Sequence, residues 1–296
     1  MTNNPRSTEP LTRALRCVRL QSYGEWGHVS RDLASELRQQ KEYERTLVRD
    51  GEFAVEGECY PCASNVRFRV DYRYAYPVDG QLIPNWREQL SCPTCGLNSR
   101  MRASIHLSEV LLRLAPTARI LIAEQTTALY GWFSGRYPGI VGFEFLAGEV
   151  PFGQRNARGI CNETLTALTF GDESFDHLLS FDVLEHIPEY RRALSECFRV
   201  LRPGGTLLFS VPFLIGESRN LVRARHASNG DIEHLLPPEY HGDPLSTSGC
   251  LAFYHFGWQL LDDLKTSGFA DAAVYLYWSR EFCYLGANQI LFVATK

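Results

Sequence analysis

The chain has 296 residues, of which 45% are hydrophobic and 22% are charged, and its formal net charge is −4. This length suits one large α/β domain with a small additional module, and the acidic balance argues against a dedicated nucleic-acid binder. No window reaches the roughly 18 apolar residues that a membrane-spanning helix needs, and residues 1–27 lack a continuous apolar signal segment, so we predict a cytoplasmic protein without a membrane partner.

Residues 1–50 form the first predicted segment, which we expect to be helical. Residues 29–48 are rich in helix formers and charged side chains, and this stretch is predicted to pack as a helix on the module that follows. The N-terminal part of the chain is near neutral in charge, which is not typical of a basic nucleic-acid-binding arm.

The module at residues 51–100 contains two CxxC pairs, Cys59 with Cys62 and Cys92 with Cys95. Each pair can present two thiolates from a tight turn, and four thiolates suit a closed tetrahedral zinc site. Because the protein would fill all four ligand positions, we predict a structural Zn²⁺ ion without an open position for substrate. The alternative is that these cysteines are buried apolar thiols. The isolated cysteines are expected to be packing residues, namely Cys17, Cys161, Cys197, Cys250 and Cys283.

Between the two pairs, residues 66–73 alternate apolar and charged side chains, which predicts a half-buried strand. Arg67, Arg69 and Arg73 would lie on its outer face, where they are either solvated or line a surface for an anionic partner. After the module, a connecting helix is predicted at residues 101–117, and the main domain then occupies residues 118–296.

The main domain shows a strand, helix, strand pattern in its centre. Apolar runs at residues 177–181 and 206–211 flank an amphipathic segment at residues 190–201, and the Arg-Pro-Gly-Gly sequence at residues 202–205 breaks the helix. Parallel pairing of the two strands requires such a helical crossover, and ligands on this architecture bind beyond the carboxyl ends of the strands. The pattern therefore points to residues 181–186 as part of a site.

The string FDHLLSFDVLEHIPEYRRALSECFRVLRPGGTLLFSVP, which runs from Phe175 to Pro212, resembles the fourth-strand to fifth-strand half of class I S-adenosylmethionine (SAM) dependent methyltransferases of the type 11-like group. The resemblance covers roughly residue 118 to the C-terminus. It implies an α/β fold with a Rossmann-like seven-stranded sheet, SAM as cofactor and methyl transfer as the reaction.

The turn after the first strand of this domain, residues 119–123, departs from the family. The family normally carries a glycine-rich G-x-G there, because the backbone approaches the cofactor closely. Here Glu124 and Thr126 occupy the glycine positions, with Gln125 between them. The resemblance implies that these residues contact SAM and that Thr126 or Thr127 caps the next helix. Glu124 is otherwise a solvated loop carboxylate, and a lost cofactor site would leave a non-catalytic binding or scaffold protein.

The second strand, at residues 140–145, ends in an acid that matches the ribose-binding position of the family. A carboxylate there can accept two hydrogen bonds from a vicinal diol, so Glu144 and the adjacent Phe145 are predicted cofactor contacts. Asn162 and Glu163 stand where the family contacts adenine.

Three residues around the end of the fourth strand complete the sites that the resemblance implies. Phe181 and Asp182 correspond to the lining of the methionine arm of the cofactor. His186 is a candidate catalytic base near the methyl-transfer site, or else it only braces the following helix.

Residues 214–253 follow the fifth strand and are too long for a simple connection, so we predict a substrate lid. Tyr240 and His241 are the candidates for orienting or deprotonating the methyl acceptor. The alternatives for these lid residues are a surface turn, or a metal site formed by His234, His241 and Asp243.

The chain ends with a predicted helix at residues 256–266 and strands at residues 272–278 and 289–294. The family would make these strands an antiparallel edge pair, with Gly286 and Asn288 in the turn between them. We therefore predict a zinc-ribbon-like module followed by a SAM-dependent methyltransferase domain that acts on a small-molecule metabolite. The same domain order resembles the large-subunit ribosomal RNA guanine methyltransferases, so an RNA base is the alternative acceptor.

Overall fold

A computed structural model describes residues 15–296 of the chain, which folds as two compact units. The first unit holds residues 15–20, 24–113 and 274–291, and the second unit holds residues 21–23, 114–273 and 292–296. The division after Arg113 lies close to the predicted start of the main domain, whereas the return of residues 274–291 to the first unit is not indicated by the sequence. The first 14 residues of the predicted N-terminal segment lie outside the described residues.

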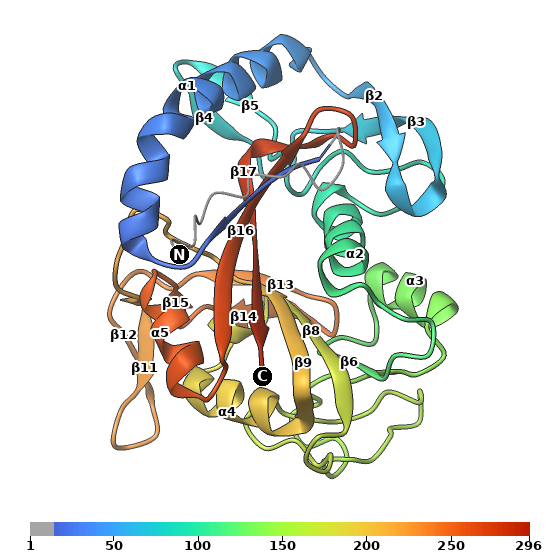
Figure 1. The fold of residues 1–296 in the computed structure, drawn as a ribbon, viewed down its shortest axis with the longest axis vertical. Coiled ribbons are helices and arrows are strands. Elements are labelled where there is room, and N and C mark those ends of the chain that lie inside the picture. The colour runs from blue at the N-terminus through green and yellow to red at the C-terminus, as the bar shows by residue number, and fades with distance from the viewer. Residues whose placement is uncertain (1–14) are drawn as a thin grey trace, which may run out of the picture. The chain divides into compact units, whose positions relative to one another are not determined.

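The second unit is built on parallel strands in the order β7, β6, β8, β9, of which β6, β8 and β9 can be followed side by side in Figure 1. Their bounds are β6 (Ile120–Ile122), β7 (Ile140–Gly142), β8 (Phe175–Phe181) and β9 (Leu201–Ser210). The end of β17 (Tyr284–Thr295) pairs with β9 in antiparallel orientation. With β16 (Asp271–Ser279) and β1 (Arg16–Leu20) the sheet has seven strands, in the order β1-β16-β17-β9-β8-β6-β7. The predicted α/β, Rossmann-like fold is therefore confirmed.

The predicted strand, helix, strand pattern of the second unit is also confirmed. Helix α4 (Tyr190–Val200) joins β8 to β9 and ends where the Arg-Pro-Gly-Gly sequence begins. Its buried side chains recur at helical spacing, because one face packs in the interior while the other meets solvent. They are Tyr190, Ala193, Leu194, Cys197 and Val200. A side chain at Gly205 would place Cβ only 2.8 Å from the Arg202 carbonyl oxygen, so the chain needs glycine at this position.

Two shorter helices complete the second unit. Helix α3 (Ala128–Arg136) begins after the turn that follows β6, and the Thr127 hydroxyl accepts a hydrogen bond from the Tyr130 amide at 3.1 Å. The predicted threonine cap is thus present at Thr127. Helix α5 (Gln259–Thr266) begins three residues later than predicted.

The segment at residues 214–253 is not irregular, because short strands pair within it and at its end. Strand β10 pairs with β15, β11 with β12, and β13 with β14, each in antiparallel orientation. The bounds are β10 (Leu221–Val222), β11 (Ala224–His226), β12 (Ile232–His234), β13 (Tyr240–Asp243), β14 (Ser246–Leu251) and β15 (Tyr254–His255). Backbone pairing gives this segment a defined conformation.

The first unit contains a long helix, two hairpins and a second helix. Hairpin β2–β3 carries the first cysteine pair at its turn, and α2 begins after the second pair with the Asn98 side chain accepting from the Met101 amide. The bounds are α1 (Tyr23–Leu47), β2 (Phe53–Cys59), η1 (Tyr60–Cys62), β3 (Ser64–Val70), β4 (Tyr76–Val78), β5 (Gln81–Ile83) and α2 (Ser99–Leu112). The predicted helix, half-buried strand and connecting helix all have counterparts, but α1 begins six residues before its predicted start and α2 ends five residues before its predicted end.

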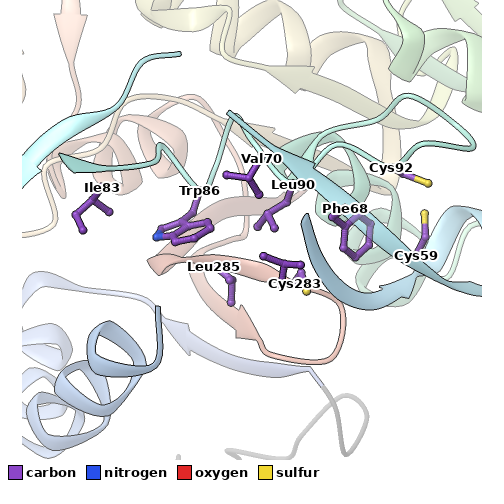
Figure 2. Close-up of a cluster of buried hydrophobic side chains, with 10 residues drawn as sticks. Cys59, Phe68, Val70, Ile83, Trp86, Leu90, Cys92, Cys283 and Leu285 are labelled. Carbon is purple, nitrogen blue, oxygen red and sulfur yellow. The ribbon is translucent and has the colours of Figure 1, made fainter. Parts of the chain in front are cut away.

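The core of the first unit is a cluster of buried side chains from β2, β3, the segment before α2, and the start of β17. Figure 2 shows Leu90 between Val70 and Leu285, with Trp86 on one side and Phe68 on the other, next to Cys59 and Cys92. The sulfur atoms of these two cysteines point toward one another. Burial of this apolar surface stabilises the unit around its cysteines.

Three expectations about the chain ends need correction. The N-terminal segment contains β1, which pairs with β16 from Arg16 opposite Trp278 to Leu20 opposite Val274, so the segment is not helical throughout. Because β1 covers β16, the last two strands are not an edge pair. The turn between them lies at residues 280–283, and Gly286 and Asn288 lie inside β17.

Gly286 has a different role from the predicted one. Its φ of +100° distorts β17 locally, and the amides of Gly286 and Ala287 donate to Glu44 Oε1 at 2.8 and 3.3 Å. The Trp278 indole N–H donates to the same oxygen at 3.0 Å. The glycine therefore marks a bulge that binds a buried carboxylate, and this cannot be read from local turn preferences.

Candidate functional site

The carboxyl ends of β6 and β7 bring Glu144 against the turn without glycines. Glu144 Oε1 accepts hydrogen bonds from the Gln125 amide at 2.7 Å, the Thr126 amide at 2.9 Å and the Thr126 hydroxyl at 2.7 Å. Glu124 accepts from the Thr127 hydroxyl. The turn thus keeps its shape through side-chain carboxylates, where glycines would allow a tighter backbone path.

A glycine is nevertheless required beside this turn, in the neighbouring strand. A Cβ at Gly142 would lie 2.4 Å from the Tyr130 ring and 2.7 Å from the Glu124 carbonyl oxygen. The missing side chain at the end of β7 lets the turn and the start of α3 lie directly against that strand.

An exposed aromatic pair lies next to Glu144 in the sequence. Phe145 is 60% exposed, and its ring stacks with that of Phe152 with ring centroids 6.3 Å apart and an interplanar angle of 27°. A flat apolar surface of this kind suits contact with a planar ligand.

The predicted adenine contacts have their side chains turned inward. The Asn162 side chain accepts from the Leu146 amide at 2.9 Å and donates to the Val150 carbonyl. The Glu163 carboxylate is fully buried and accepts from the amide and hydroxyl of Thr169. In this structure both side chains brace loops, and neither presents an exposed face to a ligand.

The end of β8 places Phe181 and Asp182 at the carboxyl edge of the sheet. Phe181 is buried, and Asp182 has a left-handed φ of +54°. The Asp182 amide donates to the Ser210 carbonyl at 2.9 Å, and the Ser210 hydroxyl donates to the Asp182 carboxylate at 2.9 Å. These bonds hold the chain as it leaves β8 and enters the short helix η2 (Leu184–His186).

The structure brings His186 and His241 together around Glu185. His241 Nδ1 lies 3.4 Å and His186 Nε2 lies 3.7 Å from Glu185 Oε1, and the two imidazole rings meet edge to face with centroids 4.9 Å apart. Together they are one of two groups, within the described residues, that are placed to hold a metal ion. Glu185 is the central residue of this cluster; it lies within residues 181–186, to which the sequence pattern points, but no sequence signal singles it out.

A second carboxylate supports His241 from its other side. Glu239 Oε1 lies 3.0 Å from His241 Nε2 and 3.0 Å from His255 Nε2, and Arg223 forms an ion pair with Glu239 at 3.1 Å. The contact with Glu185 raises the pKa of His241 to about 9, against an opposing effect of burial and with a further contribution from Glu239. The two carboxylates therefore favour the protonated form of His241.

Strand β14 belongs to the segment predicted as a lid, and the end of this segment contacts the cluster. His186 Nδ1 lies 2.9 Å from the Leu251 carbonyl oxygen, and the Phe253 amide donates to the Glu185 carbonyl at 2.8 Å. Burial is the largest of several causes that together raise the pKa of Cys250 to about 11, and the others are the carboxylates of Asp243, Glu185 and Glu144. The segment therefore lies at the carboxyl end of β8, close to both candidate halves of the site.

The remaining predicted lid residues do not join the cluster. Tyr240 is 58% exposed and precedes His241 on β13, where successive side chains point to opposite faces of a strand. His234 is exposed on β12, and the Asp243 carboxylate accepts from the Leu245 amide at 2.8 Å. Within the described residues, His241 is thus grouped with Glu185 and His186, and His234 and Asp243 lie outside that group.

The four cysteines of the CxxC pairs form the other group placed to hold a metal. Sγ of Cys59 lies 3.8 Å from that of Cys95, and Sγ of Cys62 lies 3.9 Å from that of Cys92. A tetrahedral site with Zn–S bonds of about 2.3 Å has sulfur atoms about 3.8 Å apart. The spacing of the thiols therefore fits one tetrahedral ion.

Comparison with known proteins gives a similarity for part of the second unit. Residues 131–209 match the sequence model of a methyltransferase domain. This stretch of the chain is therefore similar to a methyltransferase domain. A probable S-adenosylmethionine-dependent methyltransferase of Mycolicibacterium smegmatis is 48% identical over 48 residues, which are 16% of this chain and 19% of that protein. A malonyl-[acyl-carrier protein] O-methyltransferase of Methylococcus capsulatus is 31% identical over 105 residues, which are 36% of this chain and 33% of that protein.

Solved structures resemble the chain at lower similarity. An S-adenosylmethionine-dependent methyltransferase from Mesorhizobium loti has a TM-score of 0.40 and 19% identity, covering 65% of this chain and 100% of that one. The aligned part spans about a fifth to a third of the two curated relatives named above. Among the described residues, no helix has the length and apolar character to cross a bilayer.

Proposed function

We propose that the chain is a SAM-dependent methyltransferase that acts on a small-molecule acceptor. The observation that carries the proposal is the Glu144 carboxylate, which faces the turn after β6 in a chain that is similar, over residues 131–209, to a methyltransferase domain. Relatives named for malonyl-[acyl-carrier protein] and for ubiquinone biosynthesis favour a metabolite over an RNA base, as does the net charge of −4.

The residues around Glu144 suit the ribose and adenine end of SAM. We infer that Glu144 Oε2, which accepts none of the three bonds from the turn, takes the hydroxyls of the ribose diol, and the exposed ring of Phe145 offers a surface for a planar base. Bound SAM supplies a methyl group that is already activated on a sulfonium. The protein is then required mainly to align the acceptor and exclude water.

The other end of the cofactor would lie near the ends of β6 and β8. Glu124, Gln125 and Thr126 are the proposed contacts on the turn, and Phe181 and Asp182 those after β8. A carboxylate of Glu124 or Asp182 suits a cationic ammonium group. For Asn162 and Glu163 we propose a bracing role in place of the predicted adenine contact, because their side chains form inward bonds.

His186 and His241 are the proposed residues on the acceptor side. Both lie at the carboxyl end of β8 and are held by partners that fix their ring orientation. Tyr240 stays a candidate only for the rim of the site, because its side chain is exposed. A general-base role for His241 would require loss of the proton that Glu185 and Glu239 stabilise on it.

A structural Zn²⁺ ion is proposed for the first unit, held by Cys59, Cys62, Cys92 and Cys95. The support is the match between the observed sulfur separations and those of a tetrahedral thiolate site. Burial raises the pKa of Cys59 and Cys62, whereas for Cys92 the backbone N–H groups of Cys95 and Thr94 outweigh burial and lower the pKa to about 7. A thiolate is the form that binds zinc, so a bound cation would be needed to hold all four cysteines in that form.

Calorimetry with SAM and S-adenosylhomocysteine tests the proposed function. One binding site per chain for either ligand is expected, followed by turnover in a screen of small acceptors with hydroxyl, amine and carboxyl groups. If neither ligand binds to the folded full chain, the turn without glycines has lost the cofactor and a binding or scaffold role is favoured. Turnover on RNA that falls steeply with salt, without turnover on metabolites, would favour the RNA alternative.

A further inference from the structure

The cluster of Glu185, His186 and His241 has the composition and spacing of a metal site that is separate from the four cysteines. One ligand atom from each residue lies within 4.8 Å of the others. Two ligands that each bind an ion at about 2.1 Å lie about 3.0–3.4 Å apart at octahedral or tetrahedral angles. The observed separations of 3.4 and 3.7 Å from Glu185 Oε1 to the two ring nitrogens are close to this range.

Glu185 itself needs a cation. Its side chain has no exposed surface, and within the described part of the chain neither carboxylate oxygen accepts a hydrogen bond. Buried carboxylates are normally hydrogen-bonded, paired or bound to metal. The contacts of Oε1 with the two imidazoles are ion-pair distances, so this oxygen faces both ring nitrogens of the cluster.

Both histidines are oriented as metal-binding histidines usually are. His186 Nδ1 lies 2.9 Å from the Leu251 carbonyl oxygen, which leaves Nε2 facing Glu185. His241 Nε2 lies 3.0 Å from Glu239, which leaves Nδ1 facing Glu185. A ring N–H donated to a carbonyl or carboxylate fixes the tautomer and directs the other nitrogen's lone pair at an ion.

The outer partners are themselves held in place. Glu239 contacts His255 Nε2 at 3.0 Å and Arg223 at 3.1 Å, so its orientation toward His241 is set from two sides. The Leu251 carbonyl belongs to β14, whose pairing with β13 also positions His241. Both histidines of the cluster are therefore backed by partners that are themselves held in place.

We propose that Glu185, His186 and His241 bind one divalent first-row transition-metal ion at the carboxyl end of β8. One carboxylate and two imidazoles are the protein ligands of several zinc and iron(II) sites, in which the remaining positions stay open. This site differs from the cysteine cluster, where protein ligands fill all positions. On the function proposed above, and resting on it, the open positions take an oxygen of the methyl acceptor and lower its pKa.

A proton competes with the ion for the same place, since protonated His241 can also pair with Glu185. The two arrangements predict different effects of Glu185→Gln. With a metal site, the wild type binds the ion and is stabilised by it, and the variant loses both effects. With an ion pair alone, neither protein binds the ion, and the variant differs from the wild type only in a lower unfolding temperature.

Titration with Mn²⁺, followed by electron paramagnetic resonance, tests the proposal on the full chain. Mn²⁺ prefers oxygen and nitrogen ligands to four thiolates, so the cysteine cluster should not add to the number of Mn²⁺ ions bound per chain. We expect one tightly bound Mn²⁺ per chain in the wild type, and at least a tenfold weaker affinity in Glu185→Gln and His241→Gln. His234→Gln is the matched control, because His234 is an exposed histidine of the same segment; its affinity should equal that of the wild type.

Two further readouts keep the test independent of folding defects and of catalysis. Electron spin-echo spectroscopy of the wild-type complex should show coupling to imidazole nitrogen, and Mn²⁺ should raise the unfolding temperature of the wild type but not of Glu185→Gln. Less than half an equivalent of bound Mn²⁺, or bound Mn²⁺ without nitrogen coupling, would overturn the proposal. Loss of SAM binding with intact Mn²⁺ binding would overturn only the proposed function.

Discussion

Glu144→Gln tests the proposed cofactor site most directly, because the structure allows the charge to be removed without loss of the surrounding turn. Glu144 Oε1 accepts three hydrogen bonds, from the Gln125 amide and from the amide and hydroxyl of Thr126. A glutamine amide oxygen has two lone pairs, so it can accept two of these three bonds. The variant should therefore fold with a small loss of stability, and its main change is in what the side chain offers to a ligand.

The expected loss of affinity follows from the two hydrogen bonds of a ribose diol. Hydrogen bonds to a charged group contribute about 1.5–3 kcal/mol, compared with about 0.5–1.5 kcal/mol for neutral pairs. Loss of the charge from such a pair costs about 1.5–3 kcal/mol in total, which raises Kd about ten- to a hundredfold. Glu144→Ala should also lose the three bonds to the turn, so its unfolding temperature should fall as well.

Calorimetry with S-adenosylhomocysteine, with thermal unfolding of the free proteins, measures both effects. Glu163→Gln is the matched control, because the Glu163 carboxylate is buried and bonded to Thr169. We expect that variant to unfold at a lower temperature while Kd stays within a few-fold of the wild type. Wild-type affinity in a folded Glu144→Gln protein would show that the carboxylate does not hold the ribose, and would weaken the alignment with the methyltransferase family.

Three further predictions concern other parts of the chain. Protein purified without chelator should contain one zinc per chain by metal analysis, and Cys92→Ser should lose it and unfold the first unit; less than about half an equivalent in the wild type contradicts the site. His241→Ala should lower turnover and leave the SAM Kd nearly unchanged in calorimetry, and a joint loss of both would make His241 a cofactor or structural residue. Burial lowers the pKa of His106 from 6.5 to about 4, so between these pH values the unfolded chain binds a proton that the folded chain does not. The free energy of unfolding should therefore fall by up to about 3 kcal/mol as pH drops from about 6.5 to 4. In a denaturation series, His106→Gln should reduce this dependence on pH, and an unchanged dependence contradicts the assignment.

Local patterns predicted the elements of the second unit well. The strand, helix, strand pattern around α4, the break before Gly205 and the Thr127 cap all depend on interactions between residues a few positions apart. The same holds for the two CxxC pairs, since each pair is shaped by its own turn. Such features are readable because helical periodicity, turn chemistry and capping act over a few residues.

The chain ends were predicted less well, because their conformation depends on distant partners. β1 is a strand through its pairing with β16, about 260 residues later, and local composition gives no sign of that neighbour. Gly286 was predicted in a turn and instead forms a bulge around the Glu44 carboxylate. Strand pairing and buried carboxylates are long-range interactions that propensity cannot report.

The sequence by itself determined the kind of chemistry that each region can support. The first unit offers four thiolates. The second unit offers an acid at the end of its second predicted strand and histidines that follow its fourth. Only the tertiary structure decided which of these residues meet. Glu185 and His241 are 56 positions apart, and they come together because the pairing of β13 with β14 and the bond from Phe253 to Glu185 carry the segment onto the end of β8. Tyr240, next to His241, faces away from it because neighbouring side chains in a strand point to opposite faces.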